Sequence, residues 1–440
     1  MTVFSLPGPI LLVLLLPLLF PLFRSRSARK RKSMLLELLP VLLYCVFLLL
    51  ALVFHGGCGL CHQLPETGLY LSLSFGAVIL CYLAALPEEE RRSPAPFLLP
   101  AMTTLSGVVF LQKDHSNLFA GGGVLAGALC VSSLLHGGAY PGAYLRSFPL
   151  RLGLSALVIG ALSMFGEPRL STPGFLLAVL LASVLLLPAP LPRRTEKVLF
   201  PGFLRTDQAL FVCLPPLLVF HLLRGIPAKA AIPFWPILFL GILTALSGLL
   251  FAKTALFVEE LADGLTAAGT GFLIAGFLTF LPEGRNGALF LALLLPLATA
   301  LSGLSLSFLS QRFRTRTFQG LSALGTNVEP LRLAFLLGAF QGMSLPVVGG
   351  LLGEWLLLKA ISSVSVGVAV LAVIGVFLTF VLVVERARTL FSGESVSRLS
   401  TSDMILASEV LPSEGWALSL ASLFLLALDL IGSLGLIAGG

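Results

Sequence analysis

Residues 342–360 read "GMSLPVVGGLLGEWLLLKA", an apolar segment that carries one carboxylate, Glu354. The segment belongs to a longer apolar run, residues 331–359. As one straight helix this run would span roughly 42 Å, against a bilayer core of about 30 Å. Pro346 lies near its middle, just before Gly349 and Gly350. Because proline removes a backbone donor and clashes with the preceding turn, we expect a broken or kinked helix here.

The composition of the whole chain sets its class. Of 440 residues, 57% are hydrophobic and 11% are charged, and the mean hydropathy is +1.01. Soluble domains carry about a quarter charged residues, so a water-soluble globule is excluded. We expect an all-α polytopic membrane protein that lies in the lipid bilayer.

The net charge of +7 comes from short basic clusters between apolar runs. Such clusters are typical of cytoplasmic loops, since the positive-inside rule places Lys and Arg there, and they do not indicate a nucleic-acid surface. The pattern predicts a bacterial-type inner membrane protein with both termini outside. The clusters are "RSRSARKRK" (24–32), "RR" (91–92), "PRRTEK" (192–197) and "QRFRTR" (311–316).

About fourteen apolar runs have the length of a membrane span, which is roughly 20 residues. The first run has no basic start and no small-residue cleavage site, so we expect a retained helix rather than a signal peptide. The predicted spans are 5–23, 34–54, 67–86, 97–112, 117–135, 147–165, 172–190, 208–226, 232–251, 263–281, 287–310, 331–359, 363–385 and 416–437.

The 342–360 stretch resembles a segment of the antiporter-like membrane subunits of respiratory complex I and of the Mrp sodium–proton antiporters. Their pattern there runs roughly A-L-x-G-L-P-x-x-x-G-F-x-G-E. Residues 240–277 and, more weakly, "NLFAGGGVLAGALCV" (117–131) are similar to further segments of that family. The positions that match the main pattern are Leu345, Pro346, Gly349 or Gly350, Gly353 and Glu354.

This resemblance implies a divergent membrane-arm subunit, with other membrane subunits as partners and no catalysis of its own. The whole complex would be a proton-translocating oxidoreductase, similar to NADH:quinone oxidoreductase or to a hydrogenase. The resemblance also implies inverted repeats and a broken twelfth helix. The expected parts are N-terminal helices (1–96), a first antiporter-like repeat (97–226), a second repeat (227–385), and a cytoplasmic connector with a C-terminal helix (386–440).

The chain departs from the family at most of its charged positions. The fifth-helix glutamate of the family is matched by Gly123, and the buried lysines of its seventh and eighth helices are missing. The histidine and lysine of the eleventh helix are missing too. Glu354 is the charge that remains. The expected function is therefore a contribution to proton translocation, or a vestige of it.

The candidate site residues have two interpretations each. Glu354 is either a proton carrier, as expected of an acid inside a membrane span, or a structural acid that caps a neighbouring helix. A second group forms either a cytoplasmic proton entry or a solvated turn with weak ion pairs. Asp429 in the last span is either paired with a partner subunit or close to water. The second group is Lys253, Glu259, Glu260 and Asp263.

The loop sequence "CGLCH" (58–62) has the spacing of a c-type haem attachment site. Cys58 and Cys61 would form the thioethers and His62 would ligate iron, with His55 available as a second axial ligand. The alternatives are a Cys58–Cys61 disulfide, which an outside location permits, and a metal pair. With haem, the chain would be a non-conducting scaffold or electron-transfer anchor.

Spectroscopy separates these interpretations of "CGLCH". Covalent haem predicts a reduced-form visible absorption band that stays with the polypeptide after denaturation and disappears in a Cys58→Ala, Cys61→Ala variant. The disulfide predicts no such band, and two thiols that become reactive to alkylation only after reduction. A colourless protein with two freely alkylated thiols would contradict both.

Overall fold

The computed structural model describes residues 10, 13–19, 34–54, 65–86, 95–136, 142–164, 173–187, 209–226, 235–313, 315, 317–321, 328–342, 350–391 and 412–438. These residues form helices, with short turns between some of them, and the one β-type pairing among them is an isolated bridge between Phe257 and Thr317. The all-α fold is confirmed. The chain divides into two compact units, residues 1–232 and 233–440.

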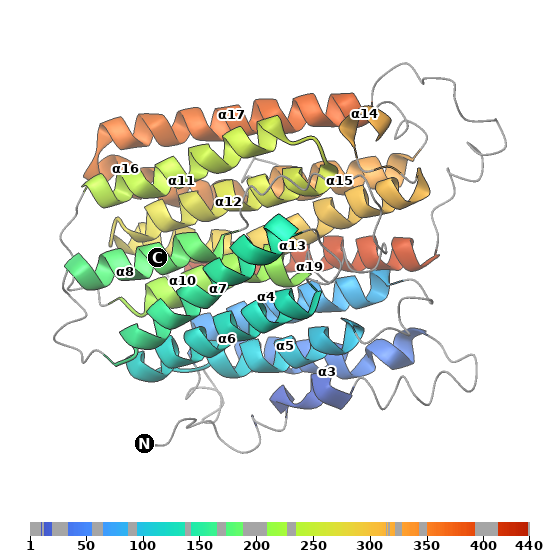
Figure 1. Ribbon diagram of the computed structural model, residues 1–440, viewed down its shortest axis with the longest axis horizontal. Helices are drawn as coiled ribbons and strands as arrows, with labels where there is room; N and C mark the ends of the chain where they lie inside the picture. Colours follow the sequence, from blue (N-terminus) through green and yellow to red (C-terminus); the bar gives the residue numbers. More distant parts are fainter. Residues whose placement is uncertain are drawn as a thin grey trace. The chain divides into compact units, whose positions relative to one another are not determined.

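Unit 1 contains a bundle of helices that run side by side (Figure 1). Its last helix starts as the π-helix η6 (Ala209–Cys213) and continues as α10 (Leu214–Arg224). Pro215 and Pro216 cannot donate backbone hydrogen bonds, so the carbonyls one turn earlier lose their α-helical donors where the helix is widened. The other elements are η1 (Leu16–Leu19), α3 (Met34–Val53), α4 (Glu66–Ala85), α5 (Ala95–Phe110), α6 (His115–His136), α7 (Gly142–Leu162) and α8 (Pro173–Leu186).

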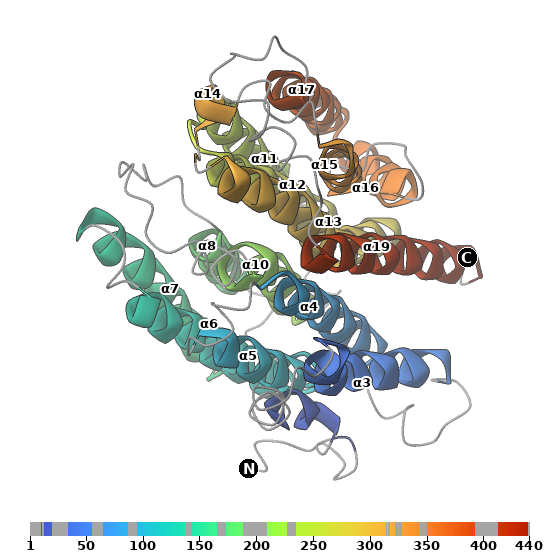
Figure 2. The same cartoon turned by 90° about the vertical axis from the view of Figure 1, so that its right-hand side faces the viewer.

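Unit 2 is built around one long helix, α13 (Pro282–Arg312), whose residues from Phe290 to Ser310 are buried. Figure 2 views several of the helices around it nearly end-on. These neighbours are α11 (Trp235–Thr254), α12 (Val258–Phe277), α14 (Phe318–Leu321), α15 (Glu329–Gly342), α16 (Gly350–Val364), α17 (Val366–Phe391) and α19 (Pro412–Ala438).

The spans expected from residue 34 onward each coincide with helix. The run 331–359 contains α15 and α16, and residues 343–349 between them lie outside the described residues, so the broken twelfth helix stays a prediction. Pro346 and Gly349 lie outside the described residues, and Gly350 is the first residue of α16. The inverted repeats and the proposed repeat boundaries stay predictions.

Four helices in the described part of the chain are long and apolar enough to cross a membrane. Six further apolar helical stretches of 10–17 described residues accompany them. The chain is a multi-pass membrane protein, with the exact number of crossings still a prediction. The four long spans are Glu66–Ala85, Ser116–Ser133, Pro282–Arg312 and Val366–Phe391.

Glycines let α12, α13 and α16 approach closely. A Cβ on Gly287 of α13 would lie 2.7 Å from the carbonyl oxygen of Gly353 in α16, and 2.8 Å from Cγ of Leu357. A Cβ on Gly353 would lie 2.6 Å from the ring of Phe290. Small residues favour this packing in membranes, because van der Waals contact rather than the hydrophobic effect drives helix association in lipid. The pairing also fixes the position of α16, and with it Glu354.

Replacing Gly287 by alanine therefore destabilises unit 2. The new methyl meets a backbone oxygen that cannot rotate away, and such overpacking costs about 1–3 kcal/mol. Thermal unfolding of the purified protein in detergent measures the effect as a lower Tm. Gly127→Ala in α6 is the matched control, because a Cβ there meets nothing within 4 Å. A Gly287→Ala protein as stable as the control would contradict the packing.

Candidate functional site

Glu354 lies in the first turns of α16, directly after the close contact that Gly353 makes with Phe290. Its side chain is partly buried, whereas the next residue, Trp355, is 63% exposed. A partly buried acid in an apolar helix faces protein or water by default, because a carboxylate in hydrocarbon is costly. The position suits a group that exchanges protons with one side of the bundle.

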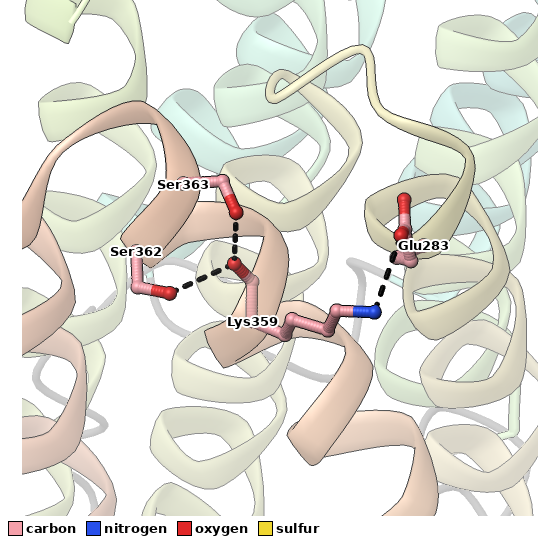
Figure 3. A network of polar contacts seen from close by, with 4 residues as sticks. All are labelled: Glu283, Lys359, Ser362 and Ser363. Carbon is pink, nitrogen blue, oxygen red and sulfur yellow. Dashed lines mark hydrogen bonds and ion pairs between the residues drawn. The ribbon is translucent and has the colours of Figure 1, made fainter.

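An ion pair joins the other end of α16 to the start of α13 (Figure 3). Lys359 Nζ lies 3.3 Å from Glu283 Oε1, with side chains 56% and 37% exposed. The hydroxyls of Ser362 and Ser363 donate to the Lys359 carbonyl at 2.8 and 2.9 Å, as Figure 3 shows. Exposed ion pairs contribute about 1 kcal/mol or less to stability. This pair therefore adds little to the packing of α16 against α13.

The acids at the start of α12 are not in a solvated turn. Glu260 is 6% exposed, and its Oε2 accepts hydrogen bonds from the backbone N–H groups of Leu256 (2.9 Å) and Phe257 (3.2 Å). This is half of a capping box, which satisfies N–H groups at a helix start. Asp263, one turn later, is 4% exposed.

The cation of the predicted group lies in the last turn of the preceding helix. Lys253 is exposed at the end of α11, and its backbone carbonyl accepts a hydrogen bond from Arg386 of α17. The guanidinium of Arg386 also lies 4.6 Å from the centre of the Phe318 ring. Glu259 belongs to α12, but its side chain lies outside the described residues. Glu260 and Asp263 are thus the members of the group that are described and buried.

The structure does not bring Glu354 and Asp263 into contact. Gly276 of α12 packs against Leu357 of α16, one turn after Glu354. Asp263 lies 13 residues before Gly276, and the two helices run in the same direction. The two acids are therefore on the order of 15 Å apart along the bundle at 1.5 Å per residue. Any proton transfer between them needs intermediate groups.

Hydroxyl groups occupy part of that interval. Thr266 Oγ1 of α12 lies 3.1 Å from Thr299 Oγ1 of α13, and both side chains are buried. Thr270 donates to the carbonyl of Thr266 at 2.7 Å. Thr266 is one turn from Asp263, so polar groups continue from the acid into the apolar bundle.

Unit 1 contains a polar cluster that sequence reasoning missed. Arg224, at the end of α10, donates to the carbonyls of Phe110 (2.6 Å) and Gln112 (3.0 Å) and to Thr67 Oγ1 (3.0 Å). His221 is fully buried, and its Nε2 lies 3.3 Å from the Leu118 carbonyl. Since a carbonyl only accepts, Nε2 carries the proton. Ends of α4, α5, α6 and α10 thus meet at one cationic cluster.

The remaining predicted site residues are placed as follows. Cys58, Cys61, His62 and His55 lie outside the described residues, so haem, disulfide and metal pair all stay predictions. Asp429 is buried in α19, with 1% of its surface exposed. In the same helix Glu414 forms a buried ion pair with Arg312 at the end of α13.

Comparison with known proteins identifies relatives of the fold. No family model matches the chain. NADH-quinone oxidoreductase subunit M of Rickettsia typhi (strain ATCC VR-144 / Wilmington) is 22% identical over 158 residues, which cover 36% of this chain and 32% of that protein. The match therefore spans about a third of the curated relative.

Solved structures match over nearly the whole chain. A chain of respiratory complex I from Thermus thermophilus aligns with a TM-score of 0.70 and 19% identity, covering 94% of this chain and 99% of that one. This protein has the fold of a complex I subunit. A chain of the archaeal membrane-bound sulfane sulfur reductase has a TM-score of 0.70 at 15% identity, covering 93% and 74%. A chain of the Mrp complex from Dietzia sp. DQ12-45-1b has 0.65 at 15%, covering 96% of each.

The cluster around Arg224 makes a direct prediction about stability. Arg224→Met removes the three hydrogen bonds that the guanidinium donates to Thr67 in α4 and to the carbonyls of Phe110 and Gln112 at the end of α5. Because each hydrogen bond to a charged group contributes about 1.5–3 kcal/mol, we expect the free energy of unfolding to fall by at least about 2 kcal/mol, measured by thermal or denaturant unfolding in detergent. Arg332→Met is the control, since the Arg332–Glu329 pair is exposed and contributes about 1 kcal/mol or less. Equal effects would contradict the role of Arg224.

Proposed function

We propose that this protein is an antiporter-like membrane-arm subunit of a multi-subunit respiratory or ion-translocating complex in a bacterial-type inner membrane. Its partners are the other membrane subunits of that complex. The observation that carries the proposal is the fold match over 94% of this chain and 99% of a complex I chain. The unrelated architectures of soluble enzymes and of single-span anchors do not produce such a match.

Within that subunit, Glu354 is the proton-transfer group. Three points support this role: the acid follows the predicted helix break, it is only partly buried, and it is positioned by the packing of Gly353 on Phe290. Breaks in membrane helices survive next to protein or water, and in transporters they mark ion sites. Glu354 reaches one side of the membrane, and Glu260 with Asp263 lies toward the other.

Proton transfer through this subunit is weaker than in a fully charged relative. Glu354 lies at one end of this route and Asp263 at the other. Neutral side chains such as Thr266 and Thr299 lie between them. Positioned acid–base groups contribute about 10²–10⁴-fold to proton transfer rates, so an interval without them slows the process. The chain contributes a partial route rather than a complete independent pump.

Replacing Glu354 by glutamine tests the function. The variant keeps the shape of the side chain but cannot carry a proton, so the share of proton translocation that this subunit carries should be lost, which lowers the translocation rate of the assembled complex in membrane vesicles. Complex assembly, measured by native gel and mass spectrometry of the purified complex, should not change. Glu329→Gln is the matched control, because Glu329 is an exposed acid paired with Arg332 in the adjacent helix α15.

Two results would overturn parts of this proposal. Unchanged translocation in Glu354→Gln would remove the proton-transfer role. Purification of the protein without any other membrane subunit, from native membranes in a mild detergent, would contradict the membrane-arm assignment.

A further inference from the structure

α11 and α17 lie next to each other in unit 2 and run in the same direction. A Cβ on Gly375 of α17 would lie 3.6 Å from Cδ2 of Leu246 in α11. Toward the end of both helices, the guanidinium of Arg386 donates to the backbone carbonyl of Lys253. Since the two contacts occur in the same order along both helices, α11 and α17 are parallel and end at the same edge of unit 2.

A third segment fixes this edge. The backbone N–H of Phe318, at the start of α14, donates to the carbonyl of Leu256 at 3.1 Å. The guanidinium carbon of Arg386 lies 4.6 Å from the centre of the Phe318 ring, a distance at which a cation and an aromatic face attract each other. Arg386 therefore contacts α11 and α14 at once, and it holds the ends of α11 and α17 together.

Each of the two helices carries a stripe of exposed apolar side chains. A helix turns about 100° per residue. Counted from the contact between Leu246 and Gly375, the α11 stripe is rotated in one sense and the α17 stripe in the opposite sense. Because the helices are parallel, opposite rotations place both stripes on one side of the pair, which we call the α11/α17 face. Its apolar residues, between 43% and 67% exposed, are Leu243 and Leu250 of α11 and Ile374, Leu378 and Val381 of α17.

The α11/α17 face ends in positive charge. Lys253 follows the α11 stripe by one turn, Arg388 follows the α17 stripe by two turns, and both side chains are exposed. Neither forms an ion pair with another described residue. With the partly buried Arg386 and the exposed acid Glu385, they give these two helix ends a net charge of +2, from three cations and one carboxylate. The face thus joins an apolar surface to an exposed cationic end.

This combination of surfaces selects an amphiphilic anion. The acyl chains of a bilayer cover the apolar parts of a membrane helix, and lipid phosphates lie where the helices end. Basic residues at that level attract anionic headgroups. A zwitterionic headgroup brings its own ammonium group toward the cations, so its net attraction is smaller. A small free anion has the right charge but makes no use of the apolar stripes.

We propose that the α11/α17 face binds an anionic phospholipid, with its phosphate between Lys253 and Arg388 and an acyl chain along the two stripes. Arg386 is a positioning residue, because its guanidinium already contacts the Lys253 carbonyl and the Phe318 ring. The inference goes beyond the proposed function and does not depend on it, since it requires only that the protein lies in a bilayer.

Lipid titration of the full-length protein tests the site. Phosphatidylglycerol is added to detergent micelles that contain the purified protein, and native mass spectrometry measures the bound fraction and hence the Kd. We expect phosphatidylglycerol to bind more tightly than phosphatidylcholine of the same chain length. Lys253→Gln and Arg388→Gln should each raise the Kd for phosphatidylglycerol about fivefold, the effect of one basic residue beside anionic lipid. Glu385→Gln should lower this Kd, because it removes a like charge from the site.

Arg332→Gln is the matched control. Arg332 is an exposed cation at the same edge of unit 2, because Phe335 of its helix pairs with Phe391 at the end of α17. It forms an ion pair with Glu329, so its loss should change the Kd less than either substitution in the α11/α17 face. Thermal unfolding without added lipid checks that every variant is folded.

Several outcomes would overturn the site. One is a Kd for phosphatidylglycerol that is unchanged in Lys253→Gln and Arg388→Gln, or that rises as much in Arg332→Gln. Another is equally tight binding of phosphatidylcholine. Glycerol phosphate that binds as tightly as the lipid would show an anion site without a role for the apolar stripes. A density map of the complete complex with a partner subunit's side chain on Lys253 would assign the face to a protein instead.

Discussion

Inside a bilayer every backbone N–H and C=O needs a partner, and that requirement governs this structure. Lipid offers no hydrogen bonds, so spans are continuous helices unless protein or water covers the interruption. Both α15 and α16, the two helices of the run 331–359, pack along α13. The long, buried α13 is therefore the element that would cover the predicted break between them.

Glycines that allow close helix packing and side chains that hydrogen-bond to backbone groups both help to meet this requirement. Gly287, Gly338 and Gly353 let backbones approach each other, so α15 and α16 lie directly against α13. Glu260 satisfies the N–H groups at the start of α12, and Arg224 satisfies carbonyls at the end of α5. Both side chains therefore act where a helix begins or ends.

Much of the fold could be predicted from the sequence, because span length and apolar composition are properties of single segments. The helices from residue 34 onward and the position of Glu354 in the twelfth span both follow from local rules. The burial of Glu260 was not predictable in the same way. Its neighbours are polar in sequence, and the capping bond to Leu256 depends on where α12 begins.

Residues that act through distant partners gave almost no signal in the sequence. Gln341 looks like an ordinary polar residue near a helix end, and its burial arises from α13, some 40 residues away. The partners of Arg224 are more than 110 residues earlier in the chain. A single cation followed by glycine at the end of an apolar run was the one local hint. Spacing rules cannot find contacts of this kind, because they depend on which helices become neighbours.

The contacts of Arg224 also have a consequence for biosynthesis. Phe110 and Gln112 lie 114 and 112 residues before Arg224, and ribosomes add about 5–20 residues per second. The carbonyls that close α5 therefore remain without their final donor for roughly 5–25 s after they leave the ribosome. During this interval the carbonyls of Phe110 and Gln112 in the nascent chain do not have the hydrogen bonds that Arg224 later donates. Its maturation thus depends on the arrival of a helix synthesised much later.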